Sequence, residues 1–235
     1  VLTDADHPEE ALINGASELL ERIGVSYNEL KLVVHSTTLA TNAIIERRGA
    51  KTGLITTDGF RDIIELRREQ IYDMYDLQAR YPEPLAPRYL RQGIRERTDS
   101  DGLILERIDE DDAVKVVEGL LGEGAEALAI ALMHSYKNPT NEEALKAVIE
   151  NHFPAVTVSI SSEVAPVINE YERTSTTIAD SYIKPSVSKY LAGVRERLSV
   201  LGYTGELLVM HSAGGVIGSD AASERPVRLL ESGPA

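Results

Sequence analysis

Apolar residues recur along the chain with two different spacings, which predict alternating helices and strands. Residues 8–23 carry an apolar side chain about every 3.6 positions, which is typical of a helix with one buried face. Residues 30–35 form a short, mainly apolar run with β-branched residues, which is typical of a strand. By the same criteria, further strands are predicted at 51–57, 126–134, 155–161 and 207–211, and further helices at 39–48, about 63–68, 109–122, 141–152 and about 170–201. This alternation predicts an α/β fold with a mainly parallel sheet flanked by helices.

Residues 69–87 differ from the rest because tyrosines and prolines replace the periodic pattern. The segment is too aromatic for a disordered linker, and we expect an ordered excursion. Two short runs follow, 93–98 and 103–106, which an Asp-Ser-Asp-Gly sequence separates, and they predict a β-hairpin. The Tyr/Pro-rich insertion therefore extends from about 69 to 106.

The composition describes an ordinary globular chain and excludes several classes of function. Of the 235 residues, 38 are acidic and 24 are basic, so the net charge is −14. This balance argues against binding to nucleic acid or an anionic membrane, although a few local donors can still hold a small anion. Cysteine is absent, which excludes disulfides, thiolate catalysis and cysteine metal sites and is consistent with a cytoplasmic protein. We recognise neither a membrane-spanning apolar run nor a signal peptide.

Three of the predicted strands end on the dipeptide His-Ser, at His35, His134 and His211. Ligands of open α/β sheets bind at the carboxyl ends of strands, so three neighbouring parallel strands would place these imidazoles along one edge. Three histidines and a water can hold a catalytic zinc ion. Alternatively, each histidine ends its strand and bonds nearby backbone. Because no acidic partner accompanies any of them, we assign no metal site.

The stretch HSTTLATN, residues 35–42, places several hydroxyl and amide side chains between a strand end and a helix start. Thr37, Thr38, Thr41 and Asn42, together with free backbone N–H groups, are suited to hold a carboxylate or a phosphate. Ordinary N-capping by Thr37 or Thr38 is the alternative. The sequence pattern leaves both interpretations open.

Two glycine-containing segments and one charged pair are weaker candidates. The backbone amides of the two segments are suited either to a phosphate or simply to turning the chain. The residues concerned are Gly214, Gly215, Ser232 and Gly233. Glu170 and Arg173 share a face of the predicted helix, where an intrahelical ion pair is the default interpretation.

Distinct sequence blocks follow one another from about residue 30 to residue 235. They read HSTTLATNAIIERRGAKTGLITTDGFRDIIEL, PEPLAPR, ALMHSYKNPTNE, SSEVAPVINEYERTSTTIADSYIKP, VMHSAGG and ESGPA. Together, and in this order, they resemble the hydantoinase A family. That family includes ATP-dependent N-methylhydantoinase, 5-oxoprolinase and subunits of acetone and acetophenone carboxylases.

The resemblance implies a partial actin-like (ribonuclease H-like) ATPase fold, in which Mg-ATP activates a carbonyl or lactam oxygen. The activated species is then hydrolysed or, in the carboxylase branch, carboxylated. The residues implied in catalysis are His35, Thr37, Thr38, Asn42, Glu170 and Arg173. Those implied in binding the nucleotide are Gly214, Gly215, Ser232 and Gly233. The implied cofactors are ATP and Mg²⁺, and the implied partner is a hydantoinase B-type subunit or domain.

The chain departs from the family pattern at several points. Ser36 stands where the family usually has glycine, and His211 where another residue is common. Family members begin with a glycine-rich β-hairpin that binds the ATP phosphates, and the given sequence has no such hairpin before Val1. Family members also continue for several hundred residues beyond the position of Ala235. We therefore expect a fragment, with an amino-terminal domain over 1–175 and the beginning of a second over 176–235. We expect these residues alone not to turn over ATP.

ATP-dependent hydrolysis of a cyclic amide is the expected function of the enzyme to which the chain belongs. Two alternatives stay open: a subunit of an ATP-dependent ketone carboxylase, and a non-catalytic actin-like module that binds nucleotide or a partner. The tyrosine-rich excursion is expected to be a substrate lid or an interface with the partner subunit. No residue separates hydantoin, 5-oxoproline and ketone substrates.

Overall fold

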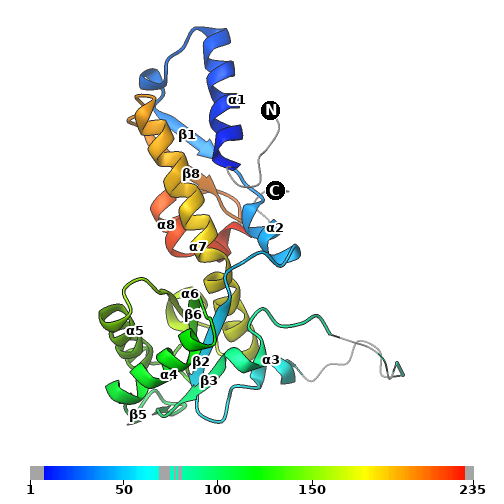
Figure 1. Ribbon diagram of the computed structural model, residues 1–235, viewed down its shortest axis with the longest axis vertical. Coiled ribbons are helices and arrows are strands. Elements are labelled where there is room, and N and C mark those ends of the chain that lie inside the picture. Colours follow the sequence, from blue (N-terminus) through cyan, green and yellow to red (C-terminus); the bar gives the residue numbers. More distant parts are fainter. Residues whose placement is uncertain (1–7, 69–74, 77, 79–80, 231–235) are drawn as a thin grey trace. The chain divides into compact units, whose positions relative to one another are not determined.

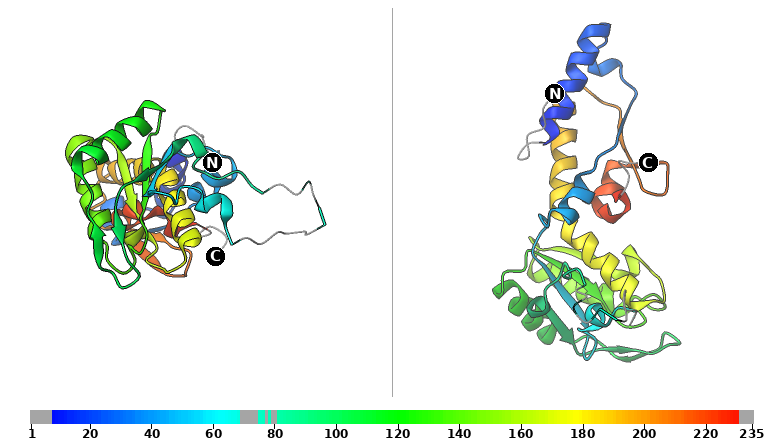
Figure 2. Two further views of the ribbon diagram at one scale, coloured as in Figure 1. Left: turned by 90° about the horizontal axis from the view of Figure 1, so that it is seen from below. Right: turned by 90° about the vertical axis from the view of Figure 1, so that its right-hand side faces the viewer.

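The computed structural model describes residues 8–68, 75–76, 78 and 81–230. The chain forms two compact units (Figures 1 and 2). The first combines the chain up to Arg48 with the chain from Ile183 onward, and the second is the continuous stretch Gly49–Tyr182. Helix α7 (Glu170–Val200) contributes residues to both and continues through Pro185. Neither α7 nor any other helix in the described residues is long and apolar enough to cross a bilayer.

A four-stranded parallel sheet forms the centre of the second unit. Its strands are β2 (Thr52–Thr57), β3 (Arg91–Ile94), β6 (Ala127–Ala131) and β7 (Thr157–Ile160). They lie in the order β3-β2-β6-β7, and every neighbouring pair is parallel. All residues of β2 and β6 are buried, which explains why these strands lack the alternation of polar and apolar residues. The predicted mainly parallel sheet is confirmed.

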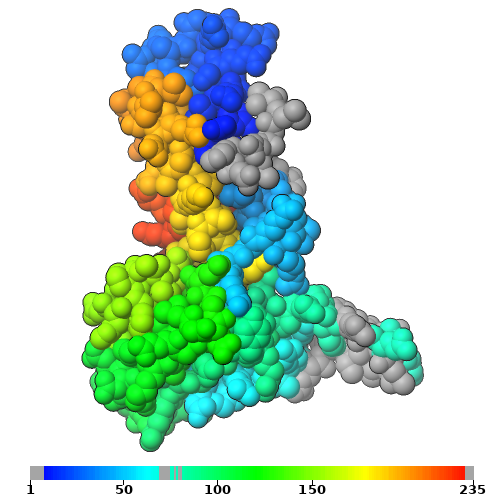
Figure 3. Space-filling model, viewed as in Figure 1, coloured from blue at the N-terminus to red at the C-terminus, as the bar shows by residue number. Residues whose placement is uncertain are grey.

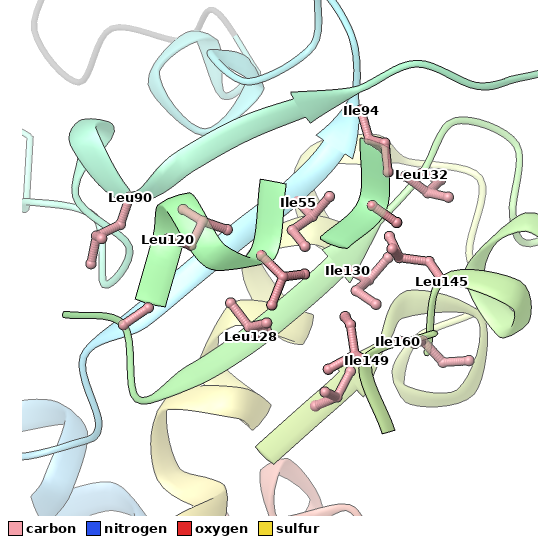
Figure 4. Close-up of a cluster of buried hydrophobic side chains, with 14 residues drawn as sticks. Ile55, Leu90, Ile94, Leu120, Leu128, Ile130, Leu132, Leu145, Ile149 and Ile160 are labelled. Carbon is pink, nitrogen blue, oxygen red and sulfur yellow. The ribbon is translucent and has the colours of Figure 1, made fainter. Parts of the chain in front are cut away.

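Helices α4 (Glu110–Gly122) and α5 (Thr140–His152) pack against one face of this sheet. Alternate strand residues point toward them, because successive side chains of a strand face opposite ways. Figure 4 shows the resulting core, in which Ile130 of β6 lies beside Leu145 of α5. The outer faces of both helices form much of the green surface in Figure 3.

The opposite face of the sheet is covered by α3 (Ile63–Leu66) and by the first part of α7. Its core contains Leu54 and Ala129 from the strands and Ile178 from α7. Leu54 and Ile55 therefore point into different cores, as expected for neighbours in a strand with helices on both sides. The predicted covering of both faces is confirmed.

The hairpin predicted at 93–98 and 103–106 is only partly correct. Residues 91–94 form β3, which pairs in parallel with β2, because Leu90 and Ile94 are buried in the sheet's core. The 3₁₀ turn η2 (Arg88–Leu90) precedes this strand. Only β4 (Arg97–Thr98) and β5 (Ile104–Glu106) form an antiparallel pair.

The first unit contains a separate three-stranded sheet in the order β1-β8-β9. Strands β1 (Leu32–His35) and β8 (Glu206–Met210) are parallel, and β9 (Val216–Gly218) returns antiparallel to β8. The strand β9 was not predicted, because its glycine-rich approach reads as a loop. β6, which the second His-Ser follows, lies in the other sheet. The condition under which the three histidines would share one edge, namely three neighbouring parallel strands, is therefore not met.

Helices pack around this smaller sheet. α1 (Pro8–Ile23), whose predicted bounds are confirmed, lies along the second half of α7 in Figures 1 and 2. Arg197 of α7 pairs there with Glu10, at 2.9 Å. The remaining elements of the unit are η1 (Tyr27–Glu29), α2 (Leu39–Ile45), α8 (Ser219–Glu224) and η3 (Pro226–Leu229).

The tyrosine-rich excursion lies partly outside the described residues, namely at 69–74, 77 and 79–80. At its end, the Arg67 guanidinium lies 4.1 Å from the centre of the Tyr81 ring and donates a hydrogen bond to the carbonyl of Pro82. The expected roles as a lid or an interface stay predictions.

Candidate functional site

His35 is the last residue of β1, and its side chain is buried in the first unit. The hydroxyl of Tyr190, on α7, lies 2.8 Å from its Nε2 atom. Burial lowers the pKa of His35, so the imidazole is neutral near pH 7. Burial also raises the pKa of Tyr190 to about 12, which keeps the phenol protonated. The two rings form a neutral, hydrogen-bonded pair at the carboxyl end of β1.

The polar residues after His35 gather at the same strand end. The Thr37 hydroxyl accepts a hydrogen bond from the backbone N–H of Leu39, at 3.2 Å. Asn42 donates to the Thr38 hydroxyl, at 3.3 Å. Thr38 stands at the N-cap of α2, yet its side chain makes no capping hydrogen bond. N-capping by Thr37 or Thr38 was one of the two interpretations of this stretch. Thr38 makes no such bond, whereas Thr37 accepts from the first N–H of α2.

The glycines after β8 lie at the same end of the same sheet, because β1 and β8 are parallel neighbours with His35 opposite Val209. Gly214 and Gly215 have φ values of 77° and 108°, which L-residues rarely adopt, and they close the turn between β8 and β9. The structure thus shows that the two glycines form a turn, whereas their contact with a nucleotide stays a prediction. Ser232 and Gly233 lie outside the described residues.

The three histidines do not form one group in the sheets. His134 follows β6, which ends at Ala131 rather than at the predicted residue 134, and it adopts φ of 56°. The strand is shorter because the next two N–H groups, those of Leu132 and Met133, donate to the side chains of Glu142 and Thr57. No cluster of three metal-ligating side chains occurs in the part of the chain that the structure describes.

The second unit has its own polar group at the carboxyl ends of β6 and β7. Arg173, only 1% exposed, donates to the Ser135 hydroxyl, which lies 2.9 Å from the Ser161 hydroxyl. Ser161 donates to the carboxylate of Glu142, which is fully buried, at 2.6 Å. Because arginine only donates and a carboxylate only accepts, the proton of each serine points from arginine toward glutamate. The two serines therefore join a buried cation to a buried anion.

Arg173 also donates to Glu170, at 3.3 Å, which is the ion pair expected from their spacing. Burial lowers the pKa of Arg173, and the nearby carboxylates of Glu142 and Glu170 oppose this shift. Its Nε atom is buried without a partner among the described residues. Through these contacts Arg173 connects buried polar groups of this unit. Its part in catalysis stays a prediction.

Sequence reasoning missed Glu142, Ser135 and Ser161 as a functional group. All three lie inside the sequence blocks that carry the family resemblance, directly after a strand or early in the next helix. The available signal was a polar residue immediately after each buried strand. That signal does not distinguish a ligand contact from a buried network.

A second buried carboxylate lies beside this network. Glu96, 4% exposed, accepts hydrogen bonds from the hydroxyl of Thr57 and from the amide of Asn141, the latter at 2.7 Å. Burial raises the pKa of Glu96, and the hydrogen bonds from Thr57 and Asn141 partly oppose it. An acid whose pKa is higher in the folded than in the unfolded chain stabilises the fold most at low pH.

We therefore expect Glu96→Gln to change how stability depends on pH. As pH rises above the unfolded value near 4.3 toward the raised folded value, the wild type loses stability that the glutamine variant does not lose. Urea unfolding at several pH values between 4 and 8 measures this difference. Glu118→Gln, on the exposed side of α4, makes the same change of charge at the surface. If the two variants changed the free energy of unfolding equally at every pH, the raised pKa of Glu96 would be contradicted.

Comparison with known proteins identifies the family. Residues 1–153 match the hydantoinase/oxoprolinase N-terminal region, and residues 173–235 match the hydantoinase/oxoprolinase domain. The chain therefore belongs to the hydantoinase/oxoprolinase family, and the resemblance seen in the sequence is confirmed. The predicted boundary at 175 and 176 stays a prediction.

Curated relatives and solved structures extend this match. An uncharacterized protein of Methanocaldococcus jannaschii is 38% identical over 224 residues, which are 94% of this chain and 33% of the relative. The caprolactamase subunit alpha of Pseudomonas jessenii is 33% identical over 231 residues, 96% of this chain and 33% of the relative. The chain thus spans about a third of the length of these relatives.

Two solved structures share the fold. Nucleotide-free acetone carboxylase superposes with a TM-score of 0.87 at 30% identity, over 100% of this chain and 35% of that chain. The ATP-dependent caprolactamase from Pseudomonas jessenii gives 0.85 at 32% identity, over 95% of this chain and 33% of that chain. The α/β fold with a parallel sheet flanked by helices is therefore that of ATP-dependent enzymes.

Proposed function

We propose that the chain is part of an enzyme subunit that uses ATP to activate the carbonyl of a cyclic amide for hydrolysis. The observation that carries this proposal is the match to the caprolactamase alpha subunit, 33% identical over 96% of this chain. The polar residues at the carboxyl end of β1 support it, because this is where ligands of α/β sheets bind. We propose the cytoplasm as the site of action and a hydantoinase B-type subunit or domain as the partner.

The donor groups at this sheet end fit phosphate and carbonyl oxygens. His35, Thr37, Thr38 and Asn42 supply imidazole, hydroxyl and amide groups. Gly214 and Gly215 are exposed beside them, although the N–H of Gly214 already donates to the carbonyl of His211, at 3.0 Å. ATP, when bound, supplies the phosphoryl group that activates the carbonyl oxygen. For Mg²⁺ we assign no ligands, since the described residues contain no cluster of three acidic or histidine side chains. Glu170 and Arg173 are proposed as further catalytic residues, as the family resemblance implies.

A ketone carboxylase subunit is the second candidate function. It is favoured by the superposition on acetone carboxylase, whose TM-score of 0.87 is similar to that of caprolactamase, 0.85. Both reactions begin with a carbonyl oxygen, so the same donors serve either substrate. A non-catalytic module that binds nucleotide is the remaining alternative.

Phosphate release from Mg-ATP by the complete natural protein, together with its candidate partner, tests the proposal. The substrates to compare are caprolactam, 5-oxoproline, hydantoin, N-methylhydantoin, and acetone or acetophenone with bicarbonate. We expect a cyclic amide to stimulate release by at least about 10-fold, because phosphoryl transfer to a positioned acceptor is far faster than to misplaced water. Stimulation only by a ketone with bicarbonate would replace the proposal with the carboxylase alternative. Binding of ATP without any stimulation would favour the non-catalytic module.

A further inference from the structure

Tyr190 forms a hydrogen bond with His35 that the proposed function does not explain. Its hydroxyl lies 2.8 Å from Nε2 of His35, although the residues are 155 positions apart in the sequence. Both side chains are buried, with 7% and 9% of their surfaces exposed. A buried hydroxyl paired with one imidazole nitrogen restricts where the proton of a neutral histidine lies.

The direction of this hydrogen bond follows from the chemistry of the two groups. Tyr190, whose pKa burial raises to about 12, keeps its proton and can donate it, and the unprotonated nitrogen of a neutral imidazole accepts. Thr37 also hydrogen-bonds Tyr190 and has a hydroxyl proton to offer its oxygen, while the Thr37 oxygen accepts from the N–H of Leu39 at 3.2 Å. This arrangement leaves the proton of Tyr190 for Nε2 of His35.

The other imidazole nitrogen faces different surroundings. Nδ1 of His35 has no hydrogen-bond partner among the described residues, and it is not one of the side-chain atoms that are buried without a partner. Glu9 lies near enough to Tyr190 for its charge to oppose formation of the phenolate, which keeps the phenol protonated. Nδ1 is therefore the imidazole nitrogen that remains for a ligand.

We propose that Tyr190 is a positioning residue that keeps His35 neutral with its proton on Nδ1, and that this N–H donates to an oxygen of the bound ligand. His35 then stabilises negative charge on a carbonyl or phosphate oxygen and does not act as a general base. The identity of that oxygen rests on the proposed function, whereas the position of the proton does not.

Nitrogen-15 NMR of the complete natural protein tests where the proton lies. We expect the shifts of a protonated Nδ1 and an unprotonated Nε2 in His35, which His35→Asn assigns by difference. Tyr190→Phe should shift the population toward a protonated Nε2. Tyr27→Phe removes another buried hydroxyl of the same unit, one that bonds Ser17 and Ile13, and should leave the His35 signals unchanged. A protonated Nε2 in the wild type, or an unchanged tautomer in Tyr190→Phe, would overturn the inference.

Two substitutions at His35 test the donor itself. The amide nitrogen of asparagine lies as far along the side chain as Nδ1, and that of glutamine lies as far as Nε2. We therefore expect His35→Asn to retain about 10-fold more ATP-dependent activity than His35→Gln, and Tyr190→Phe to lose about 10- to 100-fold in kcat. Equal losses in the asparagine and glutamine variants would contradict a donor at Nδ1. Tyr27→Phe should keep the wild-type kcat.

The two proposals fail in different ways. Mg-ATP or caprolactam should shift the Nδ1–H signal, and the absence of a shift with either would contradict the donor role. A protonated Nδ1 without turnover of any substrate would leave the tautomer standing and defeat the proposed function. Normal turnover with a protonated Nε2 would leave the proposed function standing and overturn the inferred position of the proton.

Discussion

Replacement of Glu142 by alanine is expected to lower the free energy of unfolding of the Gly49–Tyr182 unit by about 3–5 kcal/mol. Glu142 is fully buried and accepts hydrogen bonds from the N–H groups of Leu132 and Ser162, at 2.9 Å and 2.8 Å. The substitution leaves these donors without an acceptor and leaves Arg173 buried with one fewer negative charge. Each of these losses is costly in a low-dielectric interior.

Urea unfolding followed by hydrogen exchange at the amides of β6 and β7 measures this loss. Glu143→Ala is the matched control, because the next residue of α5 is exposed and its removal should change stability by no more than about 0.5 kcal/mol. Similar losses in the two variants would show that the network contributes no more than a surface residue.

A double variant separates the charge from the packing. Replacing Glu142 by leucine together with Arg173 by methionine removes both buried charges and keeps most of the volume. Such replacements are often neutral or stabilising, so we expect the double variant to lose less than the two single variants combined. The comparison also clarifies the catalytic assignment of Arg173, because activity lost in a stably folded double variant does not arise from unfolding.

The regular elements could be predicted from the sequence because their burial is local and periodic. The bounds of α1 agree at both ends, since Pro8 begins and Gly24 ends a clear 3.6-residue pattern. Strands β2 and β6 were predicted because both faces are covered, which requires an unbroken buried run. The 3.6-residue period and the unbroken apolar run depend on how deeply each element is buried, and not on which strand lies next to it.

Strand partners could not be predicted, because they depend on contacts between distant residues. The pairing of β1 with β8 joins residues such as Leu32 and Glu206, and nothing in either segment specifies the other. The described residues also form two separate sheets with parallel strands, besides the β4-β5 pair, whereas alternation alone suggested one. The three strand-end histidines would share one edge only if their strands were neighbours, and β6 lies in a different sheet.

The candidate site was predicted less completely than the fold. His35, Thr37, Thr38 and Asn42 do lie at a carboxyl sheet end, as the strand and helix pattern indicated. Arg173 was selected from the family resemblance, and it is buried and bonded within the protein. A hydroxyl or a charge after a strand serves equally well in a ligand site and in a buried network, and only the packing of distant elements distinguishes them.

Gly49 illustrates the same point and leads to a second large effect. The sequence predicted a helix over 39–48, directly before Gly49, but α2 already ends at Ile45. A Cβ atom at Gly49 would lie 2.1 Å from the ring of Tyr182, which is only 6% exposed. The N–H of Ala50 donates to the carbonyl of Tyr182, at 2.9 Å, and fixes the backbone at this distance.

We therefore expect Gly49→Ala to destabilise the Gly49–Tyr182 unit by about 1–3 kcal/mol, the usual cost of overpacking. Gly119→Ala makes the same chemical change in the exposed middle of α4, where nothing lies within 4 Å of the added atom. There the substitution should stabilise the protein by about 0.4–1 kcal/mol, because alanine loses less backbone freedom on folding. Urea unfolding of both variants measures whether each substitution lowers or raises the free energy of unfolding. If Gly49→Ala were also stabilising, the close approach of Gly49 to Tyr182 would not exist in solution.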